Sequence, residues 1–230
     1  MLYLTAAIAT AAPPSSIPEG EWRGSLAPAS ASVSTPTYVG LQGRQGTPGV
    51  FDLRFGPPYN CALALRMEAA SYSVSPRNGG RFCDALSGGT AQVSLSALSG
   101  SSLKLDIIAG DASPLSLTLD RAAGVVLPEA GRWQGGDPVP VALDYVTTPV
   151  RPGDLAGRLR FEAPRACAVE LRYGGRVQQA LAVWIVANDR GYCRQLSDRP
   201  AVLGVRGDGR AVLTVPGPGQ PQTVVLERAH

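Results

Sequence analysis

The sequence predicts an all-β protein made of two similar small antiparallel β-barrels, or tightly closed sandwiches, each with one disulfide. Apolar and polar residues alternate with a period of two along most of the chain, and no window of 12 residues shows a convincing helical period of 3.6. The 27 glycines and 20 prolines gather in clusters such as Gly-Pro, Asn-Gly-Gly and Gly-Asp-Gly, which favour turns. Each unit should therefore hold about seven or eight short strands.

An internal repeat divides the chain into two units of about 105 residues, a size that gives each unit one small core. Four blocks recur in the same order at offsets between 106 and 111: Ile17–Trp22 with Leu127–Trp133, Leu53–Arg66 with Leu159–Arg172, Cys83–Leu86 with Cys193–Leu196, and Leu119–Ala122 with Leu226–Ala229. The predicted boundaries are a signal peptide at 1–11, an extended N-terminal trunk at 12–16, barrel domain 1 at 17–122, a linker at 123–130 and barrel domain 2 at 131–230.

The strands are predicted where apolar residues alternate. In domain 1 the inward positions are Phe51, Leu53 and Phe55; Cys61, Leu63, Leu65 and Met67; Val93, Leu95 and Ala97; Leu103, Leu105 and Ile107; and Leu115, Leu117 and Leu119. In domain 2 the clearest set is Cys167, Val169, Leu171 and Tyr173. Residues 27–38 and 135–153 are less regular and are predicted as long surface loops, which can also carry recognition.

The four cysteines indicate one disulfide in each unit. None belongs to a C-x-x-C pair of the kind found in redox and zinc motifs. Because a duplicated domain must have been stable before it was doubled, we expect Cys61 to pair with Cys83 and Cys167 with Cys193. Each bridge would contribute roughly 3 kcal/mol in the loop-entropy model.

The N-terminal stretch predicts export to the periplasm or secretion. Residues 1–12 are apolar and uncharged, and Ala9-Thr10-Ala11 fits the A-x-A cleavage pattern. The stretch lacks a basic n-region, so either the true start lies upstream or the signal peptide is weak; a buried first strand is the alternative. No part of the chain has the roughly 20 consecutive apolar residues of a transmembrane helix, so we expect no membrane span.

The composition argues against several kinds of chemistry. The only histidine is His230, so Ser-His-Asp and Cys-His catalysis and histidine metal sites have no scaffolded imidazole. Basic and acidic residues alternate at a net charge of +3, which disfavours nucleic acid as a partner. Ser101 to Lys104 is formally an S-x-x-K motif, but it enters a strand and lacks its S-D-N and K-T-G partners. We expect no enzyme activity, no cofactor and no bound metal.

Each unit begins with Gly-x-Trp and ends with an arginine close to its last strand. Since the first and last strands of a closed barrel are neighbours, the guanidinium of Arg121 can cover the indole of Trp22, and that of Arg228 the indole of Trp133. This resembles the closure of the calycin group of barrels. The alternative is an unrelated core tryptophan and a solvated arginine.

Taken together, these residues resemble a family. Gly-x-Trp, Cys-x-Leu-x-Leu, a second cysteine 22 residues later and a closing Leu-x-Arg-Ala look like the bacterial periplasmic metalloprotease inhibitors of the alkaline-protease-inhibitor (Inh) type. Trp184, nine residues before Cys193, is similar to a tryptophan that the family often carries there. The resemblance implies an eight-stranded barrel with one disulfide. It also implies an N-terminal trunk that enters the cleft of a secreted zinc protease of the serralysin type and blocks its metal.

Carried over to this chain, the trunk that binds the protease is Pro13, Pro14, Ser15, Ser16 and Ile17. Only the first unit can offer a free N-terminus for such a trunk, and a disordered tail left after signal cleavage is the alternative for these residues. The alternative function is a periplasmic or cell-envelope binding or structural module that uses the long loops after each Gly-x-Trp. A small apolar ligand inside one barrel is a third hypothesis.

Overall fold

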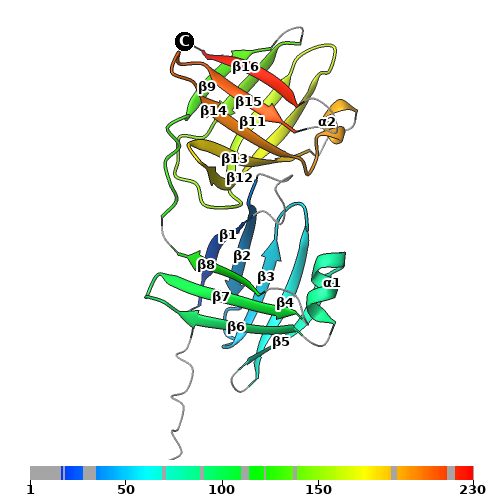
Figure 1. Ribbon diagram of the computed structural model, residues 1–230, viewed down its shortest axis with the longest axis vertical. Coiled ribbons are helices and arrows are strands. Elements are labelled where there is room, and N and C mark those ends of the chain that lie inside the picture. Colours follow the sequence, from blue (N-terminus) through cyan, green and yellow to red (C-terminus); the bar gives the residue numbers. More distant parts are fainter. Residues whose placement is uncertain are drawn as a thin grey trace, which may run out of the picture.

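The computed structural model describes residues 17, 19–27, 35–68, 71–88, 91–109, 114–121, 123–136, 139–187, 191–216 and 221–229. Within these residues the chain forms two closed antiparallel barrels of eight strands each, one after the other along the long axis of the molecule (Figure 1). The predicted all-β fold of two small barrels is confirmed. No helix among the described residues is long and apolar enough to cross a membrane.

Barrel 1 is an up-and-down barrel in which each strand pairs with the next and the last strand returns to the first. Its elements are β1 (Glu21–Leu26), β2 (Thr37–Gly43), β3 (Val50–Phe55), β4 (Cys61–Glu68), β5 (Ser71–Asn78), α1 (Arg81–Ser87), β6 (Ala91–Ala97), β7 (Ser102–Ala109) and β8 (Leu115–Asp120). The barrel closes where Arg23 of β1 lies opposite Asp120 of β8.

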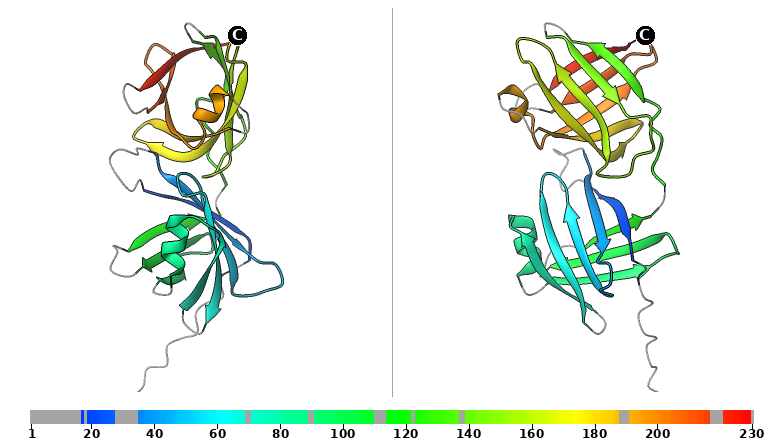
Figure 2. Two further views of the ribbon diagram at one scale, coloured as in Figure 1. Left: turned by 90° about the vertical axis from the view of Figure 1, so that its right-hand side faces the viewer. Right: turned by 180° about the vertical axis from the view of Figure 1, so that it is seen from behind.

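Barrel 2 has the same topology. Its elements are β9 (Gly131–Gly135), β10 (Val141–Tyr145), β11 (Leu155–Phe161), β12 (Cys167–Val177), β13 (Ala180–Val186), α2 (Tyr192–Gln195), β14 (Pro200–Val205), β15 (Ala211–Val215) and β16 (Gln222–Arg228). Closure joins β16 to β9 over Leu226–Arg228. Figure 2 shows both barrels from the side and from behind.

The alternating apolar residues fill the two interiors. Phe51, Leu53 and Phe55 on β3 are all buried, because successive side chains of a strand point to opposite faces. The alternation ends before two of the predicted inward positions. Met67 is 43% exposed, since the last three residues of β4 extend past the packed core, and Ala97 is exposed at the end of β6.

Both predicted disulfides are confirmed: Cys61 bonds Cys83, and Cys167 bonds Cys193. In each barrel the first cysteine opens a strand, β4 or β12, and the second lies on a short helix, α1 or α2. The sequence did not predict these helices. At seven and four residues they are too short to produce a helical period, and the disulfide fixes each one to its barrel.

Parts of the two predicted loops and the linker form regular structure, while residues 28–34 and 137–138 lie outside the described residues. The first loop is shorter, because Thr37 already lies in β2, and β10 lies inside the stretch 135–153 with Val141 and Tyr145 buried. Five residues between turn-forming neighbours were too few to reveal the alternation. The linker also packs on barrel 2: Val125 forms a bridge with Val150, and Leu127 belongs to the core.

Candidate functional site

The N-terminal end of barrel 1 is closed by the pair expected from the sequence. The guanidinium carbon of Arg121 lies 4.5 Å from the ring centroid of Trp22, whose side chain is fully buried. A Cβ at Gly20 would overlap this guanidinium, and its φ of +131° is one that other residues rarely adopt. The glycine of Gly-x-Trp therefore makes room for the arginine.

Barrel 2 has the matching contact at its own first strand. Arg228 lies 5.0 Å from the ring centroid of Trp133, and the indole nitrogen of Trp133 donates a hydrogen bond to the backbone oxygen of Glu129 at 2.8 Å. Arg228 also donates to the backbone oxygen of Ala130. The tryptophan that begins each unit and the arginine that ends it thus lie together in space, although they are about 100 residues apart in the chain.

The predicted protease-binding trunk lies outside the described residues except for its last residue, Ile17. Pro13, Pro14, Ser15 and Ser16 lie outside the described residues, while Ile17 is half-buried and packs against the core of barrel 1. In the free protein Ile17 is thus part of the barrel. A segment that reaches into a protease would start before Ile17, close to the end that Trp22 and Arg121 close.

The surface between the two barrels is built around β13. All five central residues of this strand are buried, although a barrel strand has only one face toward the core. Ala182 and Trp184 face away from the core of barrel 2, and barrel 1 covers this outer face. The indole nitrogen of Trp184 donates a hydrogen bond to the backbone oxygen of Pro36 at 2.7 Å.

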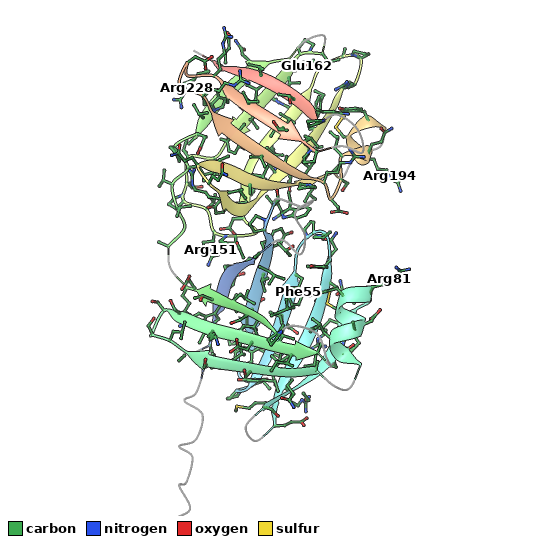
Figure 3. All side chains as sticks on the ribbon, in the orientation of Figure 1. Phe55, Arg81, Arg151, Glu162, Arg194 and Arg228 are labelled. Carbon is green, nitrogen blue, oxygen red and sulfur yellow. A yellow bond between two sulfur atoms is a disulfide. The ribbon has the colours of Figure 1, made fainter. Side chains whose placement is uncertain are left out.

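Two polar contacts between the barrels lie beside the buried side chain of Trp184. The hydroxyl of Ser25 donates to the backbone oxygen of Gly174 at 2.7 Å, and a Cβ at Gly174 would come within 2.8 Å of the oxygen of Pro36. Arg151 of barrel 2, which is labelled in Figure 3, pairs with Glu21 of barrel 1 at 3.0 Å.

The ion pairs stabilise the positive charge of Arg151. Its burial alone would lower the pKa, but the hydrogen bond from its guanidinium to Glu21 and the negative charges of Asp154 and Glu21 outweigh the burial and raise the pKa of Arg151. Arginine is a cation at physiological pH in any case, and through Glu21 the charge of Arg151 joins the two barrels.

A polar cleft of about 670 Å³ lies next to this contact, mostly over the outer face of β1 to β5. Its charged side chains other than Arg54 form ion pairs: for example, Arg23 pairs with Glu21 at 2.6 Å, and Arg77 with Asp52 at 3.1 Å. The remaining lining from barrel 2 includes Arg172, which pairs with Glu170 at 3.1 Å. The cleft is therefore largely neutralised by its own ion pairs.

A second pocket of about 970 Å³ opens at the mouth of barrel 2, beside α2. Its apolar lining combines the more exposed Val139, Val224 and Val225 with six core side chains: Val141, Leu159, Phe161, Leu196, Leu213 and Val215. Its polar lining comes from Glu162 and Arg165 after β11, Tyr192 on α2, and Gln222 and Glu227 on β16. This pocket joins an apolar interior to a charged rim.

Barrel 2 also buries a carboxylate, whose cationic partner lies at the surface. Glu129, 4% exposed, accepts hydrogen bonds from the guanidinium of Arg176 at 3.3 and 3.5 Å. Tyr145 lies in the same environment, and its hydroxyl has no hydrogen-bond partner among the described residues. Burial, and then the negative charge of Glu129, raise the pKa of Tyr145 well above its ordinary value, so this hydroxyl stays protonated.

The residues that resembled a catalytic motif have other partners. Lys104 pairs with Asp106 at 2.9 Å, and the hydroxyl of Ser101 shares a hydrogen bond with the hydroxyl of Ser99 at 3.4 Å. Ser101 lies in the turn before β7 and Lys104 lies within β7, and each is used in a local contact. The described part of the chain contains no group of three or more histidine, cysteine, aspartate or glutamate side chains that could hold a metal ion.

Three features of these sites were not predicted. The buried Glu129 and the mouth of barrel 2 correspond to no distinct pattern in the sequence. Trp184 was noticed only for its place before Cys193, whereas its structural role is the contact between the barrels. The signal for that role is the unbroken apolar run Ala180–Val186, which is typical of a strand buried on both faces.

Comparison with known proteins gives no match: no family model, no curated protein and no solved structure that was compared resembles this chain significantly.

Proposed function

We propose that the protein is an exported, non-enzymatic inhibitor of an exported zinc metalloprotease, with its N-terminal segment as the part that enters the protease cleft. The observation that carries the proposal is the position of Ile17, which packs on the core of barrel 1 beside the closed Trp22 and Arg121 end. A segment that precedes Ile17 starts from a fixed point on a rigid barrel, which lowers the entropic cost of binding.

Composition and length of the segment support this role. Pro13 and Pro14 favour an extended conformation. With cleavage after Ala11, residues 12–16 lie ahead of Ile17, and in extended form they span roughly 17 Å. This is enough to enter a cleft. Two disulfides, one in each barrel, support an oxidising compartment such as the periplasm or the exterior of the cell.

A titration of a serralysin-type protease with the mature protein tests the proposal. We expect the intact form to inhibit and a form lacking residues 12–16 to inhibit at least about thirtyfold more weakly, because the segment would hold the main binding contacts. A form in which a glycine and serine segment of equal length replaces 12–16 is the matched control, since it keeps the length but loses the prolines.

The two possible failures have different meanings. No inhibition by the intact protein would rule out the function itself. Equal inhibition by the intact and shortened forms would keep the function and rule out the N-terminal segment as its cause.

A cell-envelope binding or structural module that uses the long loops remains the alternative. The described end of the first loop gives it limited support, because Thr35 is fully buried and Pro36 accepts the hydrogen bond from Trp184. This end of the loop is used between the barrels and is not open to a partner.

A further inference from the structure

Corresponding positions in the two barrels form different clusters at the end that carries the short helix. In barrel 1 the cluster consists of three aromatic rings. Tyr59 stacks on Phe82 with ring centroids 3.9 Å apart, and Phe55 meets Phe82 edge to face at 5.1 Å. Phe55 is the last residue of β3, Tyr59 lies in the turn that follows, and Phe82 directly precedes Cys83. Three rings thus pack together over this end of barrel 1.

In barrel 2 a cation, Arg165, stands at the position of Tyr59. The equivalent residues are Phe161, Arg165 and Tyr192, at offsets of 106, 106 and 110. The guanidinium carbon of Arg165 lies 3.9 Å from the ring centroid of Tyr192 and 5.7 Å from that of Phe161. A planar guanidinium that stacks on an aromatic face keeps its N–H donors free at the edge.

This cation lines the mouth of the 970 Å³ pocket, directly above the apolar core. A volume of this size is within the range of small-molecule sites, which combine mostly apolar walls with a few polar groups that fix orientation. The apolar walls that remain accessible are Val139, Val215 and Val224, and beneath them Leu159 and Leu213 are packed in the core. The pocket thus offers an apolar interior beneath a single guanidinium.

The charges around the rim leave Arg165 available. Among the described residues, no carboxylate lies within ion-pair distance of its guanidinium. Glu227 is held by Arg210 at 3.1 Å, and the hydroxyl of Tyr192 donates to the side-chain oxygen of Gln222 at 3.0 Å. Glu162, the other acid of the rim, forms no ion pair with Arg165. Arg165 is the only basic side chain among the lining residues.

We propose that the mouth of barrel 2 binds a small molecule with an apolar body and one carboxylate, with the carboxylate on Arg165 and the apolar body against Val139, Val215 and Val224. Arginine forms two parallel hydrogen bonds with a carboxylate, which fixes the orientation of the ligand as well as its charge. The site does not involve the N-terminal segment or barrel 1, so it stands independently of the inhibitor function.

Calorimetric titration of the full chain with decanoate tests the site, with decanol and decyltrimethylammonium as probes of the same chain length. We expect decanoate to bind about tenfold or more tightly than decanol, and the cation to bind most weakly. Arg165→Gln should reduce the affinity for decanoate to that for decanol. Arg165→Tyr, which recreates the ring cluster of barrel 1, should weaken the binding of all three probes.

Arg194→Gln is the matched control, because it removes one exposed positive charge from α2 without changing the pocket lining (Figure 3). Its affinity for decanoate should stay within about twofold of the wild type. The site is ruled out if decanoate does not bind the wild type. It is also ruled out if Arg165→Gln binds decanoate as tightly as the wild type does. Thermal unfolding of Arg165→Gln and Arg194→Gln checks that both variants are folded.

Discussion

Replacement of Trp184 by alanine is expected to lower the free energy of unfolding of barrel 2 by about 3–5 kcal/mol and to loosen its contact with barrel 1. The indole is 1% exposed, and it fills the space between β13 and the start of β2. Its removal leaves a cavity between two surfaces, and the backbone oxygen of Pro36 loses its donor. Urea unfolding followed by circular dichroism measures the loss.

Trp184→Phe separates packing from hydrogen bonding. It keeps a buried ring but removes the indole N–H, so we expect a loss of only about 1 kcal/mol. In Trp184→Ala the two barrels should also unfold in separate transitions, since less surface couples them. A loss below about 1 kcal/mol in the free energy of unfolding of the alanine variant would show that barrel 1 does not pack against this side chain.

Removal of the cation beside the buried carboxylate should have the second large effect. Arg176→Met leaves Glu129, 4% exposed, without its counter-ion, and we expect a loss of about 3 kcal/mol in the free energy of unfolding at neutral pH. If the cause is the uncompensated charge, replacement of both residues by methionine should recover about 2 kcal/mol of that loss. Chemical unfolding of Arg176→Met, Glu129→Met and the double variant tests this in one double-mutant cycle.

The chain offers a close control for this pair. Arg210 and Glu227 lie 3.1 Å apart in the same barrel, but their side chains are 54% and 64% exposed. Arg210→Met should therefore cost at most about 1 kcal/mol. Similar losses for Arg176→Met and Arg210→Met would contradict the role of burial.

The features predicted correctly depend on local patterns that repeat. Inward residues such as Leu53 and Leu105 follow from the period of a strand. The pairing of Cys61 with Cys83 follows from the argument that each unit was first stable alone. Both kinds of inference need only one barrel at a time, and the structure bears out both. The duplication behind the second argument stays a prediction.

The features that were missed depend on contacts between distant segments. Trp184 contacts Pro36, 148 residues away, and no periodicity within one unit points to that partner. Strand β10 was hidden because five residues between turn-forming neighbours show too little alternation. The cation of the barrel 2 mouth was visible in principle, since Arg165 stands 106 residues after Tyr59, but its meaning appears only once the ring cluster of barrel 1 is known.

Competition with an active-site ligand tests the proposed mechanism most directly. A labelled hydroxamate that ligates the zinc of a serralysin-type protease would be bound first, and the mature protein would then be titrated into the complex. If residues 13–16 enter the cleft, the protein should displace the hydroxamate, and a form lacking 12–16 should not. A stable complex of protease, hydroxamate and intact protein, with undiminished affinity for both, would contradict entry of the N-terminal segment into the active site.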